Sequence, residues 1–323
     1  MRYALFLSLT LLFACGDDRP TATTAVTTTV APNDRSLAAG TVVTFVSGET
    51  DQPVRDAMVT VAGRSYSTDA SGGVVLAERV ARGGLIDVFT PDFLDRQTYV
   101  RSNEETRFAL FPKRSPTGLD ESFTFEILYT SARNGERLRM YRLTPGTTEA
   151  WLVPSPQIRA DLVAMRFVEN GAHLIGDATR GQVVFHVTES PPAGTMFFDL
   201  VVDPEGVRQE GDFVAIAQTW ATAWGITGGT VRYLSMEVVR SSTTVHELGH
   251  LFGPAHSSGS CDVMNTDRDR LRVDRFSPRE QLMMNLMLKR RPGNDHPDND
   301  RQAPTQWQLG IDGSGGLTTR CSS

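Results

Sequence analysis

Three of the six histidines in this 323-residue chain fall within one stretch of eleven residues. His246, Glu247, His250, Gly253 and His256 stand in the order H-E-x-x-H-x-x-G-x-x-H. Positions i and i+4 of an α-helix share one face, so His246 and His250 can offer two imidazole nitrogens to one metal ion. Glycine tolerates the left-handed conformation that ends helices, which would let Gly253 turn the chain and bring His256 back as third ligand. Three protein ligands with one open position predict a catalytic zinc site.

Glu247 follows the first ligand and is placed to hold a metal-bound water without being a ligand itself. Zinc lowers the pKa of its water and polarises a carbonyl group, and Glu247 would take the water's proton as general base and pass it to the leaving amine. Histidines on an amphipathic helix are often only core or surface groups, but the longer pattern with its glycine and third histidine favours the metal.

The residues HELGHLFGPAH resemble the zinc signature of the metzincin metallopeptidases, which have a methionine in a tight turn beneath the metal. Met264 lies eight residues after His256 and is the candidate for this Met-turn. Some metzincins carry a tyrosine two residues further on, where this chain has Thr266. The resemblance implies hydrolysis of a peptide bond by an α+β domain with a twisted mixed sheet, whose edge strand adds the substrate backbone as a further strand. The expected edge strand is Thr195 to Val202.

Residues 38–113 form short apolar runs with turn signals about every ten residues, which predicts an all-β sandwich. The run TDQPVRDAMVTVAGRSYSTDASGGVVL resembles the carboxypeptidase regulatory-like, transthyretin-related sandwich, a non-catalytic accessory module. The resemblance leaves two roles open, a structural spacer or a module that binds peptide, glycan or a partner surface. The expected fold class is therefore multidomain, an all-β sandwich followed by the α+β catalytic domain.

The N-terminus has the pattern of an export signal. An apolar run from Tyr3 to Ala14 follows a single arginine and is too short to span a bilayer. The residues Leu12-Phe13-Ala14-Cys15 resemble the lipobox of bacterial lipoproteins, with residues 1–14 removed and Cys15 lipidated; the alternative is a plain signal peptide cut near Ala14. Residues 15–37 are rich in Thr and Ala and predict a disordered tether. We expect an exported protein anchored to the membrane by lipid, and Gly16 favours the outer membrane.

Two cysteines remain after Cys15, and in an oxidising compartment Cys261 and Cys321 are expected to pair and tie the tail to the Met-turn; two independent thiols are the alternative.

The formal net charge is −6, with 32 basic and 38 acidic side chains, which gives no reason to propose a nucleic acid partner. The expected partners are a protein or peptide substrate and the membrane, and no sequence feature sets an oligomeric state.

Residues 118–291 are assigned to the zinc domain. We expect strands at 123–128, 137–143, 182–188, 195–202 and 231–239, and helices from Ser155-Pro156 to about Gly176, within 211–224, over the zinc motif, and from the capping box Ser277-Pro278-Arg279-Glu280. Ile158, Leu162, Met165 and Val168 are expected on one buried helix face, with Leu282, Met283, Leu286 and Met287 on another. His173 and His186 are interpreted as structural.

The tail, residues 292–323, is polar. Its segment Asn294 to Asp300 is rich in oxygen ligands that could hold Ca²⁺, but it lacks the glycine and distal glutamate of a calcium loop, which favours a solvated acidic turn.

Two other functions use the same features. A surface adhesion lipoprotein would have lost catalysis and would bind through the sandwich, although the intact Glu247 favours an enzyme. A zinc amidohydrolase would apply the same metal chemistry to cell-wall peptides.

Overall fold

The computed structural model describes residues 35–130, 139–140, 142–222, 225–259, 261–265, 275–300 and 316–322. The predicted leader, Cys15 and nearly all of the tether lie outside the described residues, and so does Thr266. The chain divides into one unit up to Asp34 and a second from Arg35 to Ser323, and all that follows concerns the second. This unit is a mixed α/β structure with several sheets and few helices. No helix of the described residues is long and apolar enough to cross a membrane.

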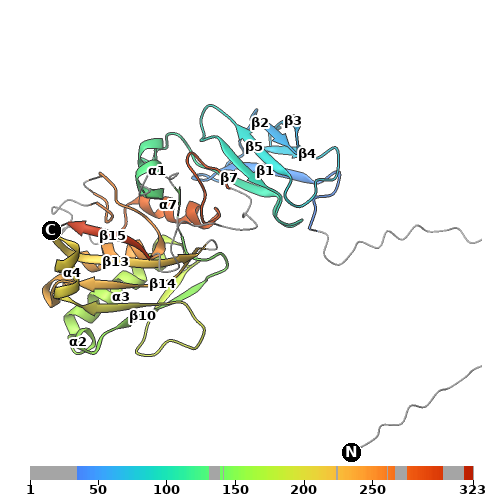
Figure 1. Cartoon of the computed structure of the whole chain (residues 1–323). Helices are drawn as coiled ribbons and strands as arrows, with labels where there is room; N and C mark the ends of the chain where they lie inside the picture. Colours follow the sequence, from blue (N-terminus) through green and yellow to red (C-terminus); the bar gives the residue numbers. More distant parts are fainter. Residues whose placement is uncertain are drawn as a thin grey trace, which may run out of the picture. The chain divides into compact units, whose positions relative to one another are not determined.

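Residues 35–112, the N-terminal β region, contain two sheets (Figure 1). One has the order β4-β1-β7 and the other the order β3-β2-β5-β6. Buried apolar side chains from both sheets share one cluster, as expected where strands alternate between a covered and an open face. The strands are β1 (Val42–Ser47), β2 (Met58–Val61), β3 (Arg64–Ser67), β4 (Gly73–Val75), β5 (Leu85–Phe89), β6 (Arg96–Tyr99) and β7 (Arg107–Leu110).

The loop before β4 shows why its sequence contains T-D-x-x-G. Asp69 Oδ1 accepts hydrogen bonds from the backbone N–H groups of Ser71 and Gly73, which closes the turn. Gly72 has a φ of +74°, and a Cβ there would lie 2.4 Å from the carbonyl oxygen of Phe45. Only glycine fits this position without strain.

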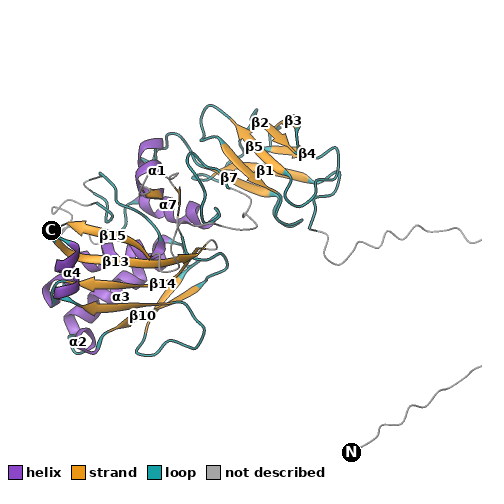
Figure 2. Ribbon diagram, in the orientation of Figure 1, coloured by secondary structure: helices purple, strands orange, loops and turns teal. Residues whose placement is uncertain are grey.

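The remaining strands form mainly one six-stranded mixed sheet (Figure 2). Its order is β11-β10-β12-β14-β13-β15; β10 pairs in parallel with β11 and β12, β12 pairs in parallel with β14, and β13 is antiparallel to both β14 and β15. The strands are β10 (Glu149–Pro154), β11 (Val184–Val187), β12 (Phe197–Val202), β13 (Phe213–Thr222), β14 (Gly225–Tyr233) and β15 (Gly316–Ser322). The short strands β8 (Tyr129–Thr130) and β9 (Arg139–Met140) form a separate ladder.

The helices are α1 (Glu121–Leu128), α2 (Pro156–Arg159), α3 (Leu162–Ala178), α4 (Pro204–Glu210), α5 (Met236–Val239), α6 (Thr243–Phe252) and α7 (Pro278–Leu288). Helix α3 packs against α6, α7 and β11, and α6 packs against β13 and β14. Their apolar side chains join those of the six-stranded sheet in one core, so α6 lies between the sheet and other helices. The predicted capping box at Ser277 and Glu280 is present, and the four predicted apolar positions of α7 are buried.

Three sequence-based assignments were wrong. Residues 123–128 are helical because the Asp120 side chain caps α1 by accepting from the Phe123 N–H at 2.8 Å. The helix predicted within 211–224 is absent, because Phe213–Thr222 forms β13. Helix α4 precedes this strand and begins after the N-cap residue Asp203, with Pro204 in its first turn. Leu162 is 78% exposed, because the chain breaks between α2 and α3 and starts a new helix there. Short apolar runs do not separate strand from helix by periodicity alone.

Two strand predictions also need correction. Thr195 to Val202 is not an edge strand, because β12 lies between β10 and β14. Strand β14 ends at Tyr233, and residues 236–239 of the predicted strand form the short helix α5, with the Ser235 side chain accepting from the Val238 N–H. The position of a strand within a sheet depends on pairing between distant segments, which the local sequence does not report.

The prediction that the segment Asn294 to Asp300 is solvated was wrong, because Asn294 and the three aspartates of this segment are buried. Asp298 and Asp300 are 0% and 1% exposed. Asp298 accepts from Arg96 Nη1 at 3.0 Å and from Arg290 Nε at 2.7 Å, and Asp300 accepts from Arg96 Nη2 at 2.8 Å. We refer to Arg96, Arg290, Asp298 and Asp300 as the buried arginine–aspartate cluster. It joins β6 of the N-terminal β region to the segment after α7, and its arginines bind two of the three carboxylates that were considered for calcium.

Charge pairing dominates this cluster. Burial by itself would raise the pKa of Asp300, but the positive charges of Arg96, Arg101 and Arg290 lower it to about 2. Two buried arginines facing two buried aspartates compensate each other's charge, which is the condition for ions to be tolerated away from water.

Candidate metal centre

Helix α6 carries the motif and is enclosed on all sides. All ten of its residues are buried, which is expected for a helix packed between a sheet and other helices. Ser242 is its N-cap residue but makes no side-chain cap hydrogen bond; Ser241 Oγ accepts from the Thr243 N–H at 3.3 Å, and Thr244 Oγ1 donates to the Val239 carbonyl at 2.8 Å. The helix stops at Gly253, whose φ of +130° is open to glycine and costly for other residues.

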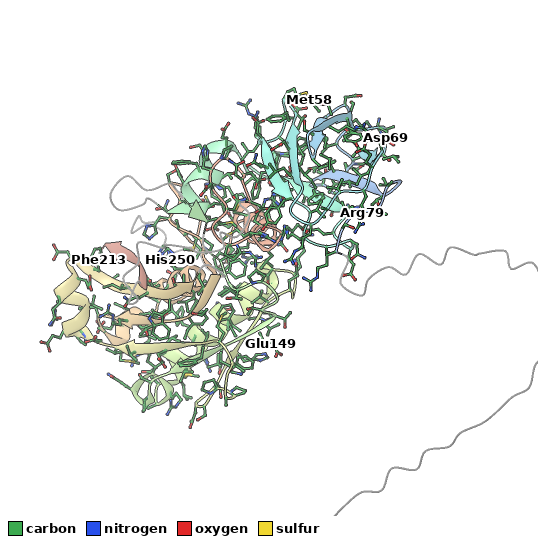
Figure 3. The ribbon with its side chains drawn as sticks, turned by 45° about the vertical axis from the view of Figure 1, so that its right-hand side comes forward. Met58, Asp69, Arg79, Glu149, Phe213 and His250 are labelled. Carbon is green, nitrogen blue, oxygen red and sulfur yellow. The ribbon has the colours of Figure 1, made fainter. Side chains whose placement is uncertain are left out.

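The three imidazoles converge on one point. His250 Nε2 lies 3.0 Å from His246 Nε2 and 3.2 Å from His256 Nε2. His246 and His250 come from successive turns of α6, and His256 returns from the loop beyond Gly253. His246 and His250 are almost fully buried and His256 is partly exposed, so the site opens on the side of His256. Figure 3 labels His250, on the helix that packs on β13, together with Phe213 at the start of that strand.

The hydrogen bonds of the Nδ1 atoms of His246 and His250 determine the protonation state of their Nε2 atoms, which face the centre of the site. His246 Nδ1 lies 2.6 Å from the Val263 carbonyl oxygen, and His250 Nδ1 lies 2.8 Å from that of Pro254. A carbonyl only accepts, so each Nδ1 carries the proton and each Nε2 presents a lone pair. Two lone pairs 3.0 Å apart repel each other unless a cation or proton lies between them.

The geometry fits a zinc ion. Tetrahedral ligands at about 2.0–2.1 Å from zinc would have their nitrogens about 3.3 Å apart. The observed separations are 3.0 and 3.2 Å, and backbone carbonyls orient the two buried rings as they do in many metal sites. Among the described residues, these histidines form the one group of three or more candidate side chains close enough to share a metal.

Glu247 is fully buried and follows His246 on α6. Tyr233, at the end of β14, is also fully buried; its burial raises the pKa of its hydroxyl, and the negative charge of Glu247 raises it further. Glu247 and Tyr233 therefore interact electrostatically within the core. A carboxylate next to a metal ligand in a protected site can accept a proton from water held at the open position.

Met264 packs beneath the metal helix. It is fully buried, and a Cβ placed on Gly249 of α6 would lie only 2.5 Å from its sulfur atom. The turn that carries Met264 also contains Val263, whose carbonyl oxygen accepts a hydrogen bond from His246 Nδ1–H. Gly249 thus allows close contact between the helix and this turn.

Glu280 holds the same turn from the other side, a role that the sequence analysis missed. Its carboxylate accepts from the N–H groups of Met264 at 2.8 Å, Val263 at 3.2 Å and Ser277 at 2.7 Å. Burial raises its pKa to about 7, although the three backbone hydrogen bonds act in the opposite direction. The capping box identified Glu280 as a helix cap, and only the structure places its second oxygen on the Met264 turn.

Asp262 organises the loop after His256. It is 1% exposed and accepts from Ser257 Oγ at 2.6 Å, from Ser277 Oγ at 2.7 Å and from the guanidinium of Arg279. Burial of Arg279 is outweighed by its hydrogen bond to Asp262, which raises the pKa of the arginine. These contacts join the loop of the third histidine to the start of α7.

The other predicted site residues are placed as follows. Cys261 is exposed, Cys321 lies on β15, and their predicted disulfide stays a prediction because the side chain of Cys321 lies outside the described residues. His173 and His186 lie at the surface, where each is within 3.4 Å of a carboxylate oxygen, of Asp177 and Glu149 respectively.

Comparison of the chain with models of known protein families and with curated proteins finds no match.

Proposed function

We propose that this chain is a zinc-dependent endopeptidase of the metzincin type. The observation that carries the proposal is the convergence of three histidine side chains. The Nε2 atoms of His246 and His256 lie 3.0 and 3.2 Å from His250 Nε2. Backbone carbonyl oxygens lie within hydrogen-bond distance of the Nδ1 atoms of the two buried rings. Zinc, when bound, would polarise the scissile carbonyl and acidify a water molecule. His246, His250 and His256 would hold the ion.

The protein's own groups would handle the proton. Glu247 Oε atoms would accept a proton from the attacking water and deliver it to the nitrogen of the leaving amine. The backbone carbonyls of Val263 and Pro254 would keep the two buried rings in the tautomer that leaves Nε2 free for metal. Buried Met264 would support the ring of His246 through the turn it shares with Val263.

The domain assignment belongs to the same proposal. The order β11-β10-β12-β14-β13, with β13 antiparallel, supports an α+β catalytic domain. The two sheets of residues 35–112, with their shared core, support the β-sandwich. Export and anchoring through lipidated Cys15 complete the proposal and are supported by the sequence pattern.

The test compares wild type with Glu247→Gln, using zinc analysis together with cleavage of casein and of peptidoglycan, each with and without a chelator. Both proteins should bind about one zinc, and the variant should lose cleavage by about 10²–10⁴-fold, the usual contribution of general base catalysis. Glu169→Gln, an exposed glutamate on α3, is the matched control and should cleave as wild type does.

The outcomes separate the candidate functions. Chelator-sensitive cleavage of casein supports the endopeptidase. Cleavage of peptidoglycan alone would replace it with a cell-wall amidohydrolase. Zinc binding without cleavage of either substrate would favour the binding lipoprotein.

A further inference from the structure

Strand β15 is an addition to an otherwise continuous sheet. The other five strands lie between Glu149 and Tyr233, whereas β15 comes from the end of the chain at Gly316–Ser322. Among the described strands it pairs with β13 alone, in an antiparallel register that sets Cys321 opposite Ala215 and Gly316 opposite Trp220. Without β15, the outer edge of the sheet would be β13.

This edge lies beside the candidate metal centre. Helix α6 packs against β13 and β14. Ala215 of β13 pairs with Tyr233 of β14, and Cys321 of β15 pairs with Ala215 on the other side. A strand added to β13 therefore runs two strand spacings, about 10 Å, from β14, one of the two strands against which the metal helix α6 packs.

The metzincin resemblance implies that an extended peptide docks on the edge strand of the sheet, and the edge against which α6 packs is β13. We propose that the chain's own segment Gly316–Ser322 occupies this edge as a competitor of substrate. This inference rests on the proposed peptidase function. An edge strand presents a row of N–H and C=O groups that binds extended backbone of almost any sequence. The opposite edge of the sheet, β11, is separated from β13 by three strands and cannot serve the same site.

The expected inhibition follows from tethering. Residues 301–315 join β15 to Asp300, which is fixed in the buried arginine–aspartate cluster. A tethered segment is present at an effective concentration on the order of 1 mM. If the free segment binds with a Kd of about 0.1 mM, it fills the edge about ten to one, and its release should raise kcat/KM about tenfold.

The test weakens the strand within the full-length chain. Thr318→Pro with Thr319→Pro removes two neighbouring N–H donors, one of which must point toward β13 because an antiparallel ladder alternates. Thr318→Val with Thr319→Val is the matched control, since it keeps both donors and the strand propensity. The readouts are kcat/KM on an unstructured peptide, hydrogen exchange of the β13 amides, and binding of a fluorescent peptide with the sequence of residues 316–322.

We expect the amides of β13 to exchange faster in the proline variant and the fluorescent peptide to bind it at one site. The variant should gain about tenfold in kcat/KM, and the peptide should inhibit it competitively. The valine control should match wild type in each measurement. Exposed β13 amides with an unchanged kcat/KM, or peptide binding that is not competitive with substrate, would overturn the proposal. Unprotected β13 amides in the wild type would overturn it as well. If no form cleaves any substrate, the proposed function fails, and competition between the labelled peptide and an unlabelled extended peptide still decides whether β13 is the docking edge.

Discussion

Replacing Gly249 by alanine should disturb the metal centre without touching a ligand. The added Cβ would lie 2.5 Å from the sulfur of Met264 and 3.3 Å from the ring of Phe276, and both side chains are almost completely buried. Overpacking of a core costs about 1–3 kcal/mol, and the better helix propensity of alanine offsets up to about 1 kcal/mol. The net loss should be about 1–2 kcal/mol, a lowering of Tm by about 2–8 °C.

The consequence for the metal follows from the Met264 turn. Displacing Met264 shifts Val263, whose carbonyl holds His246 Nδ1 at 2.6 Å. Loss of such an outer contact lowers metal affinity about 10–100-fold. Urea denaturation of the metal-free protein measures the stability, and competition with a chromophoric chelator measures the zinc affinity.

A control and a double-mutant cycle test the cause. Gly176→Ala, also within a helix, places its Cβ 3.9 Å from the nearest atom and should stabilise by about 0.5–1 kcal/mol. Adding Met264→Ala to Gly249→Ala removes the clashing atoms, so the two changes should show a coupling of about 1 kcal/mol or more in the favourable direction. A Gly249→Ala protein as stable as Gly176→Ala, with unchanged zinc affinity, would refute the packing argument.

The remaining predictions concern the tail. Asp298→Asn should destabilise by about 3–5 kcal/mol, because it leaves the buried charge of Arg96 poorly compensated, and urea unfolding measures this. The pKa of Asp300 is lowered to about 2 in the fold, so the stability it adds is complete above its unfolded value near 3.8 and falls by about 2 kcal/mol as the pH drops toward 2, which thermal melts across this range will show. The predicted disulfide between Cys261 and Cys321 should appear as a linked peptide pair in non-reducing mass spectrometry of the mature protein.

Each of the three predictions for the tail has a control or an outcome that would contradict it. Asp95→Asn changes an exposed aspartate next to Arg96 and should have little effect, so equal losses in both aspartate variants would contradict the cluster argument. An acid transition that is unchanged in Asp300→Asn would show that this carboxylate does not contribute to it. Two separately alkylated cysteines would exclude the disulfide.

Local chemistry determined what could be predicted at the metal centre. The spacing of His246 and His250 sets two rings on one helix face wherever the helix is placed. Gly253 can adopt the positive φ that ends the helix, so both features could be inferred from neighbouring residues. The capping box at Ser277 and Glu280 is local in the same sense, and it is present.

Contacts between distant segments decided the rest. That Glu280 holds the Met264 turn, that Arg96 neutralises Asp298, and that β12 lies inside the sheet all depend on pairing across many residues of sequence. The sequence by itself specified the histidine pattern and the chemistry it supports. Only the tertiary structure determined which strand lies at the sheet edge beside that pattern, because strand order is set by the best packing of the whole core and not by the composition of any one strand.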